Sequence, residues 1–193
     1  IPRPESECIV ESALDILCDS KTEARVLDLG TGSGCLLLSV MHERSHVSGV
    51  GVDCSHEAVR RARDNSFRLK MNERADFIVG NWGAPLACRF DLILCNPPYV
   101  RAEEIGDLMP DVSRFEPHLA LDGGADGLSC FRKIGPYLSR LLTTHGMVCI
   151  EVGFGQVDSV IGIFRENGLA LHGRRTDLAG VERCLVFTCL SSV

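Results

Sequence analysis

Residues 26–34 have the sequence VLDLGTGSG, and the predicted type of fold follows from them. An apolar run leads into three glycines at alternating positions, and a helix-periodic stretch begins directly after them at Cys35. This order predicts a buried strand, a tight turn and the start of a helix. Glycine allows positive φ and lets a ligand approach the backbone, and helix N-termini attract anions. The turn is therefore a candidate site for a phosphate or a carboxylate.

The spacing of the glycines separates this turn from a dinucleotide-binding turn. The dinucleotide fingerprint would place its third glycine at position 35, where the chain has Cys35, so a nicotinamide cofactor is disfavoured. Asp53 lies nineteen residues beyond Gly34, at the predicted end of the next strand, where an acid can bind both ribose hydroxyls. An adenosine fits this position. The alternative is that Asp53 caps the following helix, a role that Ser55 could also fill.

Short apolar runs alternate with helix-periodic stretches along the rest of the chain. This alternation predicts a single α/β domain over residues 1–193, in which helices cover both faces of a parallel sheet. A short polar turn joins the last two strands, which predicts an antiparallel hairpin at the end of the sheet. We expect Pro136 to kink or restart its helix. The predicted strands are residues 25–29, 47–52, 76–79, 90–95, 147–152, 169–174 and 184–190, and the predicted helices are residues 5–18, 35–44, 56–69, 128–141 and 157–166.

The composition is that of a folded, water-soluble protein. Of the 193 residues, 45% are apolar and 24% are charged, and the net charge of -6 disfavours tight binding to duplex nucleic acid. We expect neither a signal peptide nor a membrane span, because no apolar run is long enough. Ten cysteines lack Cys-x-x-Cys spacing, and Cys95, Cys149 and Cys189 lie in apolar runs, so we expect reduced thiols and a cytoplasmic protein. The six histidines lack ligand spacing, so no catalytic metal is expected.

The sequence Asn-Pro-Pro-Tyr at residues 96–99 follows directly on the predicted strand 90–95. Two consecutive prolines fix φ, so the backbone carbonyls there point in set directions. Asn96 supplies an amide donor and acceptor, and Tyr99 supplies a flat face, so the pair can hold a planar carboxamide or the edge of an aminopurine. The alternative is a rigid turn in which Asn96 bonds its own backbone. The long loop at residues 97–124 is typical of a binding segment or lid.

Residues 28–34, Asp53 and the tetrad together resemble the class I S-adenosylmethionine-dependent methyltransferases that act on amino or amide nitrogen. Further segments are similar to the peptide chain release factor glutamine N5-methyltransferases of the PrmC/HemK type, and this resemblance runs nearly end to end. It implies a Rossmann-like fold whose mostly parallel seven-stranded sheet ends in an antiparallel hairpin. The further segments are residues 1–7, 80–82, 114–117, 120–121, 124–128 and 177–180.

The resemblance implies a reaction and a set of site residues. The cofactor would be S-adenosyl-L-methionine, the product S-adenosyl-L-homocysteine, and the acceptor the glutamine of the Gly-Gly-Gln motif of a release factor. Asp53 would bind the ribose, and Trp82 would lie against the adenine, for which the alternative is core packing. The implied cofactor-binding residues are Asp28, Gly30, Thr31, Gly32, Ser33, Gly34, Asp53, Trp82 and Asn96, the implied substrate-binding residues are Asn96, Pro97, Pro98 and Tyr99, and of these Asn96, Pro97 and Tyr99 are expected to be catalytic.

The residues of the tetrad suggest how an amide nitrogen could be made to react. The oxygen of the Asn96 side chain and the carbonyl of Pro97 would accept its two N–H bonds and localise its lone pair, without a strong base before attack. Glu116 and Glu151 are possible proton acceptors. Their alternative roles are loop anchoring and solvation at a strand end.

Three features depart from the family pattern. Its members carry a helical domain ahead of this chain's first residue, and residue 1 is not Met, so we expect a fragment or processed chain whose substrate docking is incomplete. Ser6 stands where Thr is usual, and Asn81 stands where Asp is common.

Three other interpretations of the sequence stay open. They are an adenine-N6 methyltransferase of DNA or RNA, which would require base flipping, a ribosomal-protein glutamine methyltransferase, and a cofactor-binding module without catalysis. We expect a monomer with no direct nucleic-acid binding. A basic cluster on one predicted helix is expected to be a solvated face, although it could contact an RNA-bound substrate; it consists of Arg60, Arg61, Arg63, Arg68 and Lys70.

Overall fold

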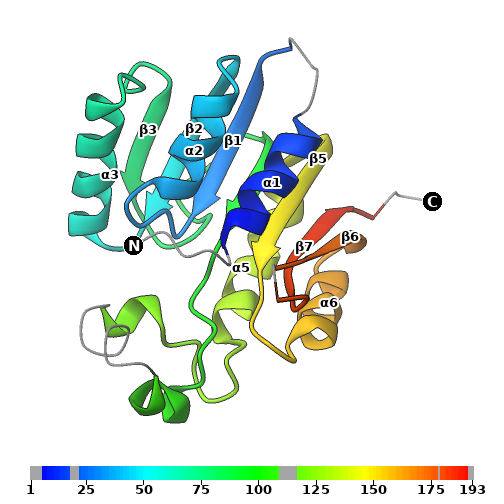
Figure 1. The fold of residues 1–193 in the computed structure, drawn as a ribbon. Helices are drawn as coiled ribbons and strands as arrows, with labels where there is room; N and C mark the ends of the chain where they lie inside the picture. Colours follow the sequence, from blue (N-terminus) through cyan, green and yellow to red (C-terminus); the bar gives the residue numbers. More distant parts are fainter. Residues whose placement is uncertain (1–5, 18–21, 109–116, 178, 191–193) are drawn as a thin grey trace.

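One sheet of seven strands runs through the molecule (Figure 1). The computed structural model describes residues 6–17, 22–108, 117–177 and 179–190. The strands are β1 (Ala24–Leu29), β2 (Val47–Asp53), β3 (Ala75–Val79), β4 (Phe90–Cys95), β5 (Leu142–Glu151), β6 (Leu169–Thr176) and β7 (Glu182–Cys189). Their order is β3-β2-β1-β4-β5-β7-β6; the first five pair in parallel, and β7 is antiparallel to both β5 and β6. The predicted mostly parallel sheet with a terminal antiparallel hairpin is confirmed.

The helices form one layer on each face of the sheet (Figure 1). Consecutive residues of a strand face opposite layers, so Val26 packs with the first layer and Leu27 with the second. This is why the central strands are almost continuously apolar. The first layer consists of α1 (Glu7–Ile16), α2 (Cys35–Glu43) and α3 (His56–Arg68), and the second of α5 (Ser129–Leu141) and α6 (Val157–Glu166).

Two elements differ most from their predictions, while other strand ends shift by one or two residues. α5 is one continuous helix and does not restart at Pro136. Pro136 and Arg132 both lie on the exposed side of this helix, so the carbonyl that lacks an amide partner can bond water. β5 begins at Leu142, five residues before its predicted start, because Leu142 pairs with Phe90 ahead of an irregularity in the ladder. Polar residues at 143–145 conceal this part of the strand from an apolar pattern.

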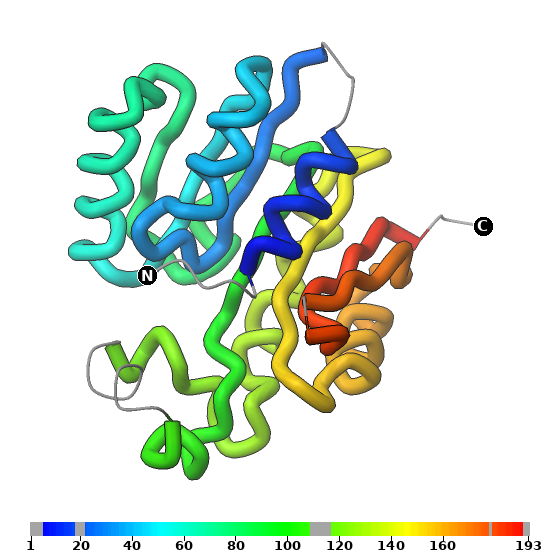
Figure 2. The backbone as a smooth tube through the Cα atoms, viewed as in Figure 1, coloured from blue at the N-terminus to red at the C-terminus, as the bar shows by residue number. Residues whose placement is uncertain are grey.

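The described parts of the segment predicted as a functional loop, residues 97–108 and 117–124, lie beyond the carboxyl ends of the parallel strands (Figure 2). These parts contain two short 3-10 helices, η2 (Ala102–Asp107) and η3 (His118–Ala120). Val100 ties its two ends together, since its N–H donates to the carbonyl of Leu121 at 3.0 Å and its carbonyl accepts from Gly123 at 2.8 Å. The predicted motifs at residues 1–5 and 114–116, including Glu116, lie outside the described residues.

The predicted buried thiols are in place. Cys95 and Cys149 are fully buried, Cys189 is partly buried, and all three are free thiols. Within the described part of the chain, no helix is both long enough and apolar enough to cross a membrane.

Candidate active site

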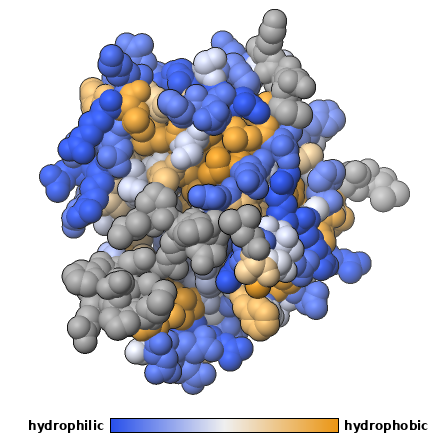
Figure 3. Space-filling view, in the orientation of Figure 1, coloured by the Kyte–Doolittle hydropathy of each residue, from blue (hydrophilic) through white to orange (hydrophobic). Residues whose placement is uncertain are grey.

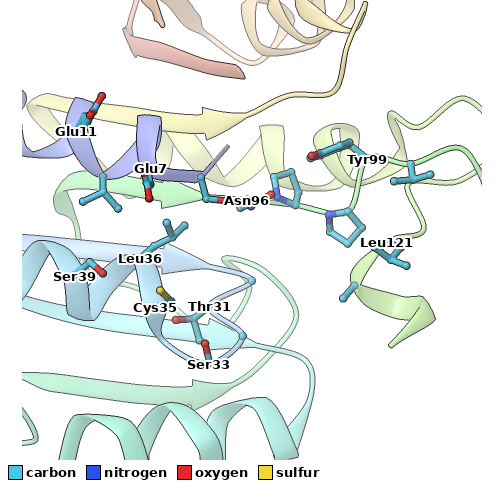
Figure 4. A pocket seen from close by; sticks show the side chains of 18 residues that line it. Glu7, Glu11, Thr31, Ser33, Cys35, Leu36, Ser39, Asn96, Tyr99 and Leu121 are labelled. Carbon is cyan, nitrogen blue, oxygen red and sulfur yellow. Dashed lines mark hydrogen bonds between the residues drawn. The ribbon is translucent and has the colours of Figure 1, made fainter. Parts of the chain in front are cut away.

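A cleft of about 630 Å³ opens at the carboxyl ends of β1 and β4 (Figure 4). This is the edge at which open α/β sheets bind ligands, and the volume suits a small-molecule site. In Figure 4 the glycine turn and the start of α2 form one wall, and the tetrad and α1 face them. The lining residues are Ser6, Glu7, Val10, Glu11, Gly30, Thr31, Gly32, Ser33, Cys35, Leu36, Ser39, residues 96–100, Ala120 and Leu121.

The glycine turn has the geometry that its sequence predicts. Gly30, Gly32 and Gly34 have φ values of 74°, 55° and 81°, in the left-handed region that favours glycine. A Cβ at Gly32 would meet no described atom within 4 Å, so the backbone there lies open to a ligand. A Cβ at Gly30 would instead lie 3.4 Å from the ring of Trp82 and 3.9 Å from the carbonyl oxygen of Asn96. The turn thus brings the indole and the tetrad together.

Asp53 joins the end of β2 to the glycine turn. Its Oδ2 accepts from the N–H of Gly32 at 2.9 Å, and its Oδ1 accepts from the N–H of Ser55 at 2.8 Å. The N-cap of α3 is Ser55, whose hydroxyl oxygen accepts from the N–H of Ala58 at 3.3 Å. The helix cap is therefore supplied without Asp53. A half-buried carboxylate fixed beside an open glycine has further lone pairs for a bound hydroxyl.

Asp28 is a buried acid beneath the same turn. Its Oδ2 accepts from the hydroxyl of Thr31 at 2.6 Å, and its Oδ1 is buried without a hydrogen-bond partner among the described residues. Burial raises the pKa of the Asp28 carboxyl from 3.8 to about 7, against the opposing effect of the Thr31 hydroxyl and the backbone of Leu37. Asp28 is therefore partly protonated near neutral pH.

This pKa predicts how stability depends on pH. Between about pH 4 and 7 the unfolded chain loses the Asp28 proton while the folded chain retains it, so the free energy of unfolding falls by on the order of 4 kcal/mol as the pH rises. Asp28→Asn keeps an acceptor for Thr31 and removes this titration. In urea unfolding from pH 4.5 to 8, the variant should gain stability over the parent chain as the pH rises, up to about pH 7. Parallel curves for the two proteins would contradict the pKa shift.

The tetrad is held by a chain of hydrogen bonds. The Nδ2 of Asn96 donates to the hydroxyl oxygen of Ser6 at 2.8 Å, and the Ser6 hydroxyl donates to Glu151 Oε2 at 2.8 Å. The Tyr99 hydroxyl donates to Glu151 Oε1 at 2.9 Å. The Asn96 side chain thus bonds to α1 instead of to its own backbone, the alternative that its Asn-Pro sequence left open. Glu151 is only 1% exposed, so the expected solvation of this strand end is wrong.

Gln156 is a further residue that sequence analysis did not single out. Its Nε2 donates to the carbonyl of Tyr99 at 2.9 Å and to that of Gly127 at 3.3 Å, and its Oε1 accepts from the N–H of Gly153 at 2.9 Å. It therefore ties the end of the tetrad to two loops. Gln156 lies 57 residues beyond Tyr99 in sequence, and no local pattern marks it.

Trp82 lies beside the cleft. It has a φ of 50°, packs partly buried against the second core layer, and contacts the position of a Gly30 Cβ. The described cleft lining includes neither Trp82 nor Asp53, although both lie next to residues that do line it. Asn81 is exposed. The packing of Trp82 and a contact with adenine are compatible, because one ring face can serve each role.

The remaining predicted groups lie away from the cleft. Four members of the basic cluster are exposed on α3 and Lys70 is exposed just beyond its end, on a surface that is mostly hydrophilic in Figure 3 but also exposes Phe67. Two of its members are already bonded: Arg61 pairs with Glu57, and Arg63 donates to the carbonyl of Phe77. No group of three or more potential metal ligands occurs among the residues that the structure describes.

Comparison with known proteins gives the family. Residues 11–111 match the methyltransferase small domain family. A release factor glutamine methyltransferase from Rhodospirillum rubrum is 44% identical over 96% of this chain and 56% of that protein. A release factor glutamine methyltransferase from Thermodesulfovibrio yellowstonii is 37% identical over 96% of this chain and 67% of that protein.

A solved structure agrees with these relatives. The release-factor-specific protein-(glutamine-N5) methyltransferase from Alicyclobacillus acidocaldarius has a TM-score of 0.58 and 27% identity, over 98% of this chain and 94% of that one. The chain spans 56% to 65% of the length of three curated relatives that are 39% to 44% identical to it. By its match to the family model, its sequence identity and the extent of the match, the chain belongs to the methyltransferase small domain family and to the release factor glutamine methyltransferases.

Proposed function

We propose that the chain transfers a methyl group from S-adenosylmethionine to the side-chain nitrogen of the glutamine in the Gly-Gly-Gln motif of a peptide chain release factor. The observation that carries this proposal is the orientation of the Asn96 amide in the cleft. Its Nδ2 is committed to Ser6, so Oδ1 is the atom that Asn96 offers to a ligand. An oxygen acceptor there matches the N–H donors of a primary amide.

The residues present fit the proposed cofactor. The glycine turn offers an open backbone at Gly32 for the methionine part, and Thr31 and Ser33 supply hydroxyls on the same wall (Figure 4). Asp53 would accept hydrogen bonds from the ribose hydroxyls, and Trp82 would cover the adenine. The Asp28 oxygen that has no hydrogen-bond partner among the described residues lies beneath the turn. The remaining proposed contacts are Gly30, Gly34 and Asn96. When bound, S-adenosylmethionine supplies a methyl carbon that is already activated by its sulfonium.

The chain's own residues would mainly orient the acceptor. Asn96 Oδ1 and the carbonyl of Pro97 would accept the two N–H bonds of the glutamine amide, while Pro98 keeps the corner rigid and Tyr99 covers the amide plane. Such acceptors localise the nitrogen lone pair as positive charge develops there. Alignment of two reactants can contribute on the order of 7 to 11 kcal/mol to lowering a barrier. Asn96, Pro97 and Tyr99 are therefore the proposed catalytic residues.

The decisive experiment offers the chain two acceptors. The chain would be incubated with S-adenosylmethionine and either a release factor or an adenine-containing oligonucleotide, and the products weighed by mass spectrometry. We expect one added methyl group on the Gly-Gly-Gln glutamine of the release factor. A release factor with that glutamine replaced by alanine is the control and should gain no mass. Methylation of the oligonucleotide alone would overturn the proposal in favour of an adenine-N6 methyltransferase.

A further inference from the structure

Ser6 occupies a helix-capping position without acting as a cap. It is the N-cap residue of α1, and serine is among the preferred residues at that position. The structure gives its hydroxyl no capping bond to α1, however. The hydroxyl lies instead between Asn96 and Glu151, at 2.8 Å from each partner atom. A capping contribution of about 1 kcal/mol is thus forgone for a contact with the tetrad.

The direction of these hydrogen bonds is set by Glu151. Each of the two Glu151 carboxylate oxygens accepts from one hydroxyl, Oε2 from that of Ser6 and Oε1 from that of Tyr99. The Ser6 hydroxyl has one hydrogen, which goes to Glu151, so toward Asn96 it can only accept. Asn96 must therefore turn its NH₂ group to Ser6, and its oxygen takes the opposite side of the amide.

We infer that Ser6 and Glu151 are positioning residues that fix which end of the Asn96 amide meets the acceptor. Glu151 fixes the direction of the Ser6 hydroxyl bond, and the Ser6 hydroxyl in turn fixes the direction of the Asn96 bond. Asn96 therefore presents its oxygen, instead of its NH₂ group, to the glutamine amide. If the Asn96 amide were reversed, its NH₂ group would face the N–H of the glutamine amide, and the two donors would repel each other. This inference rests on the proposed function, because the orientation of Asn96 matters only if the group that receives the methyl carries N–H donors.

A direct role for Glu151 as a base fits the geometry less well. Both of its oxygens accept from hydroxyls, and it is only 1% exposed. The described residues that line the cleft include Ser6 and Tyr99 but not Glu151, which lies behind them. Glu151 therefore acts through these two hydroxyls.

Two variants of Ser6 that are isosteric with each other separate the effect of the hydroxyl from the effect of side-chain volume. Threonine and valine have the same shape, and only threonine keeps the hydroxyl. Ser6→Val should lower kcat about tenfold, which corresponds to the loss of one hydrogen bond. Ser6→Thr should recover that turnover. Both variants should bind S-adenosylmethionine with an affinity within about twofold of the parent chain by calorimetry. An equal loss of kcat in the two variants would overturn the inference.

Glu151→Gln tests the source of the polarity. A glutamine offers one oxygen and one NH₂ group, so one of the two hydroxyls must reverse its bond. We expect a loss of kcat about as large as in Ser6→Val, and a double variant no worse than the poorer single variant, because both act through one chain of bonds. If the kcat loss of the double variant equalled the product of the two single losses, the inference would be overturned. Glu43→Gln, an exposed carboxylate at the far end of α2, is the control and should leave turnover unchanged.

A readout without substrate separates this inference from the proposed function. In nitrogen-15 spectra of the chain alone, the Asn96 side-chain NH₂ signal can be assigned by its absence in Asn96→Ala. Its protons should exchange slowly in the parent chain and in Ser6→Thr, and fast in Ser6→Val and Glu151→Gln. The same exchange rate in all four proteins would overturn the inference. Absence of methyl transfer to a release factor, with this pattern intact, would overturn the proposed function alone.

Discussion

Asn96→Ala should lower kcat for methylation of a release factor by about 10²- to 10³-fold, the range seen when one preorganised hydrogen-bonding group is removed from an active site. The variant loses the proposed acceptor for the glutamine N–H. Affinity for S-adenosylmethionine should change less than about threefold, because Asn96 is only one of several proposed cofactor contacts, and the glycine turn and Asp53 stay in place, joined by a 2.9 Å bond. Single-turnover rates and calorimetric titration measure the two quantities separately.

A second asparagine provides the matched control. Asn65 on α3 donates from Nδ2 to the carbonyl of Ser33 at 3.0 Å, so its amide supports the glycine turn instead of the tetrad. Asn65→Ala should therefore weaken S-adenosylmethionine binding severalfold and leave kcat at saturation nearly unchanged, which is the opposite pattern. If Asn96→Ala lost cofactor affinity as strongly as turnover, Asn96 would belong to the cofactor site.

The parts of the site that the sequence could predict are those that depend on local order. The glycine turn, Asp53 and the tetrad each follow a short apolar strand directly, and parallel strands place their carboxyl ends at one edge of a sheet. Strand assignment from apolar runs was therefore enough to bring them together. The same reasoning failed at the start of β5, where polar residues 143–145 interrupt the pattern.

The contacts that hold the tetrad could not be predicted, because they join distant positions. Ser6 and Asn96 are 90 residues apart, and Ser6 and Glu151 are 145 apart. Glu151 looked like an exposed acid at a strand end. It is buried because β7 lies beside β5, with Glu151 opposite Cys184, and α1 packs across this part of the sheet. Only the three-dimensional arrangement of these elements shows that the acid has hydroxyl partners.

Gly51→Ala should cost about 3 kcal/mol of stability, toward the upper end for overpacking a core. Gly51 lies in β2 between Asp28 of β1 and Phe77 of β3. A Cβ there would lie 2.6 Å from Cδ1 of Phe77 and 2.7 Å from the hydroxyl oxygen of Thr31. Both side chains are buried, so neither can move away freely. Displacing Thr31 also strains its bond to Asp28, so S-adenosylmethionine binding should weaken together with stability.

The same substitution at Gly162 should have the opposite sign. Gly162 is exposed in the interior of α6, and a Cβ there would meet no described atom within 4 Å. Alanine reduces the backbone entropy lost on folding, so Gly162→Ala should stabilise the chain by about 0.5 to 1 kcal/mol. Urea unfolding of both variants measures the difference. Equal effects at the two sites would show that the space around Gly51 does not govern its cost. Opposite signs would mean that the fit of β2 against Thr31 and Phe77 holds the glycine turn in its position.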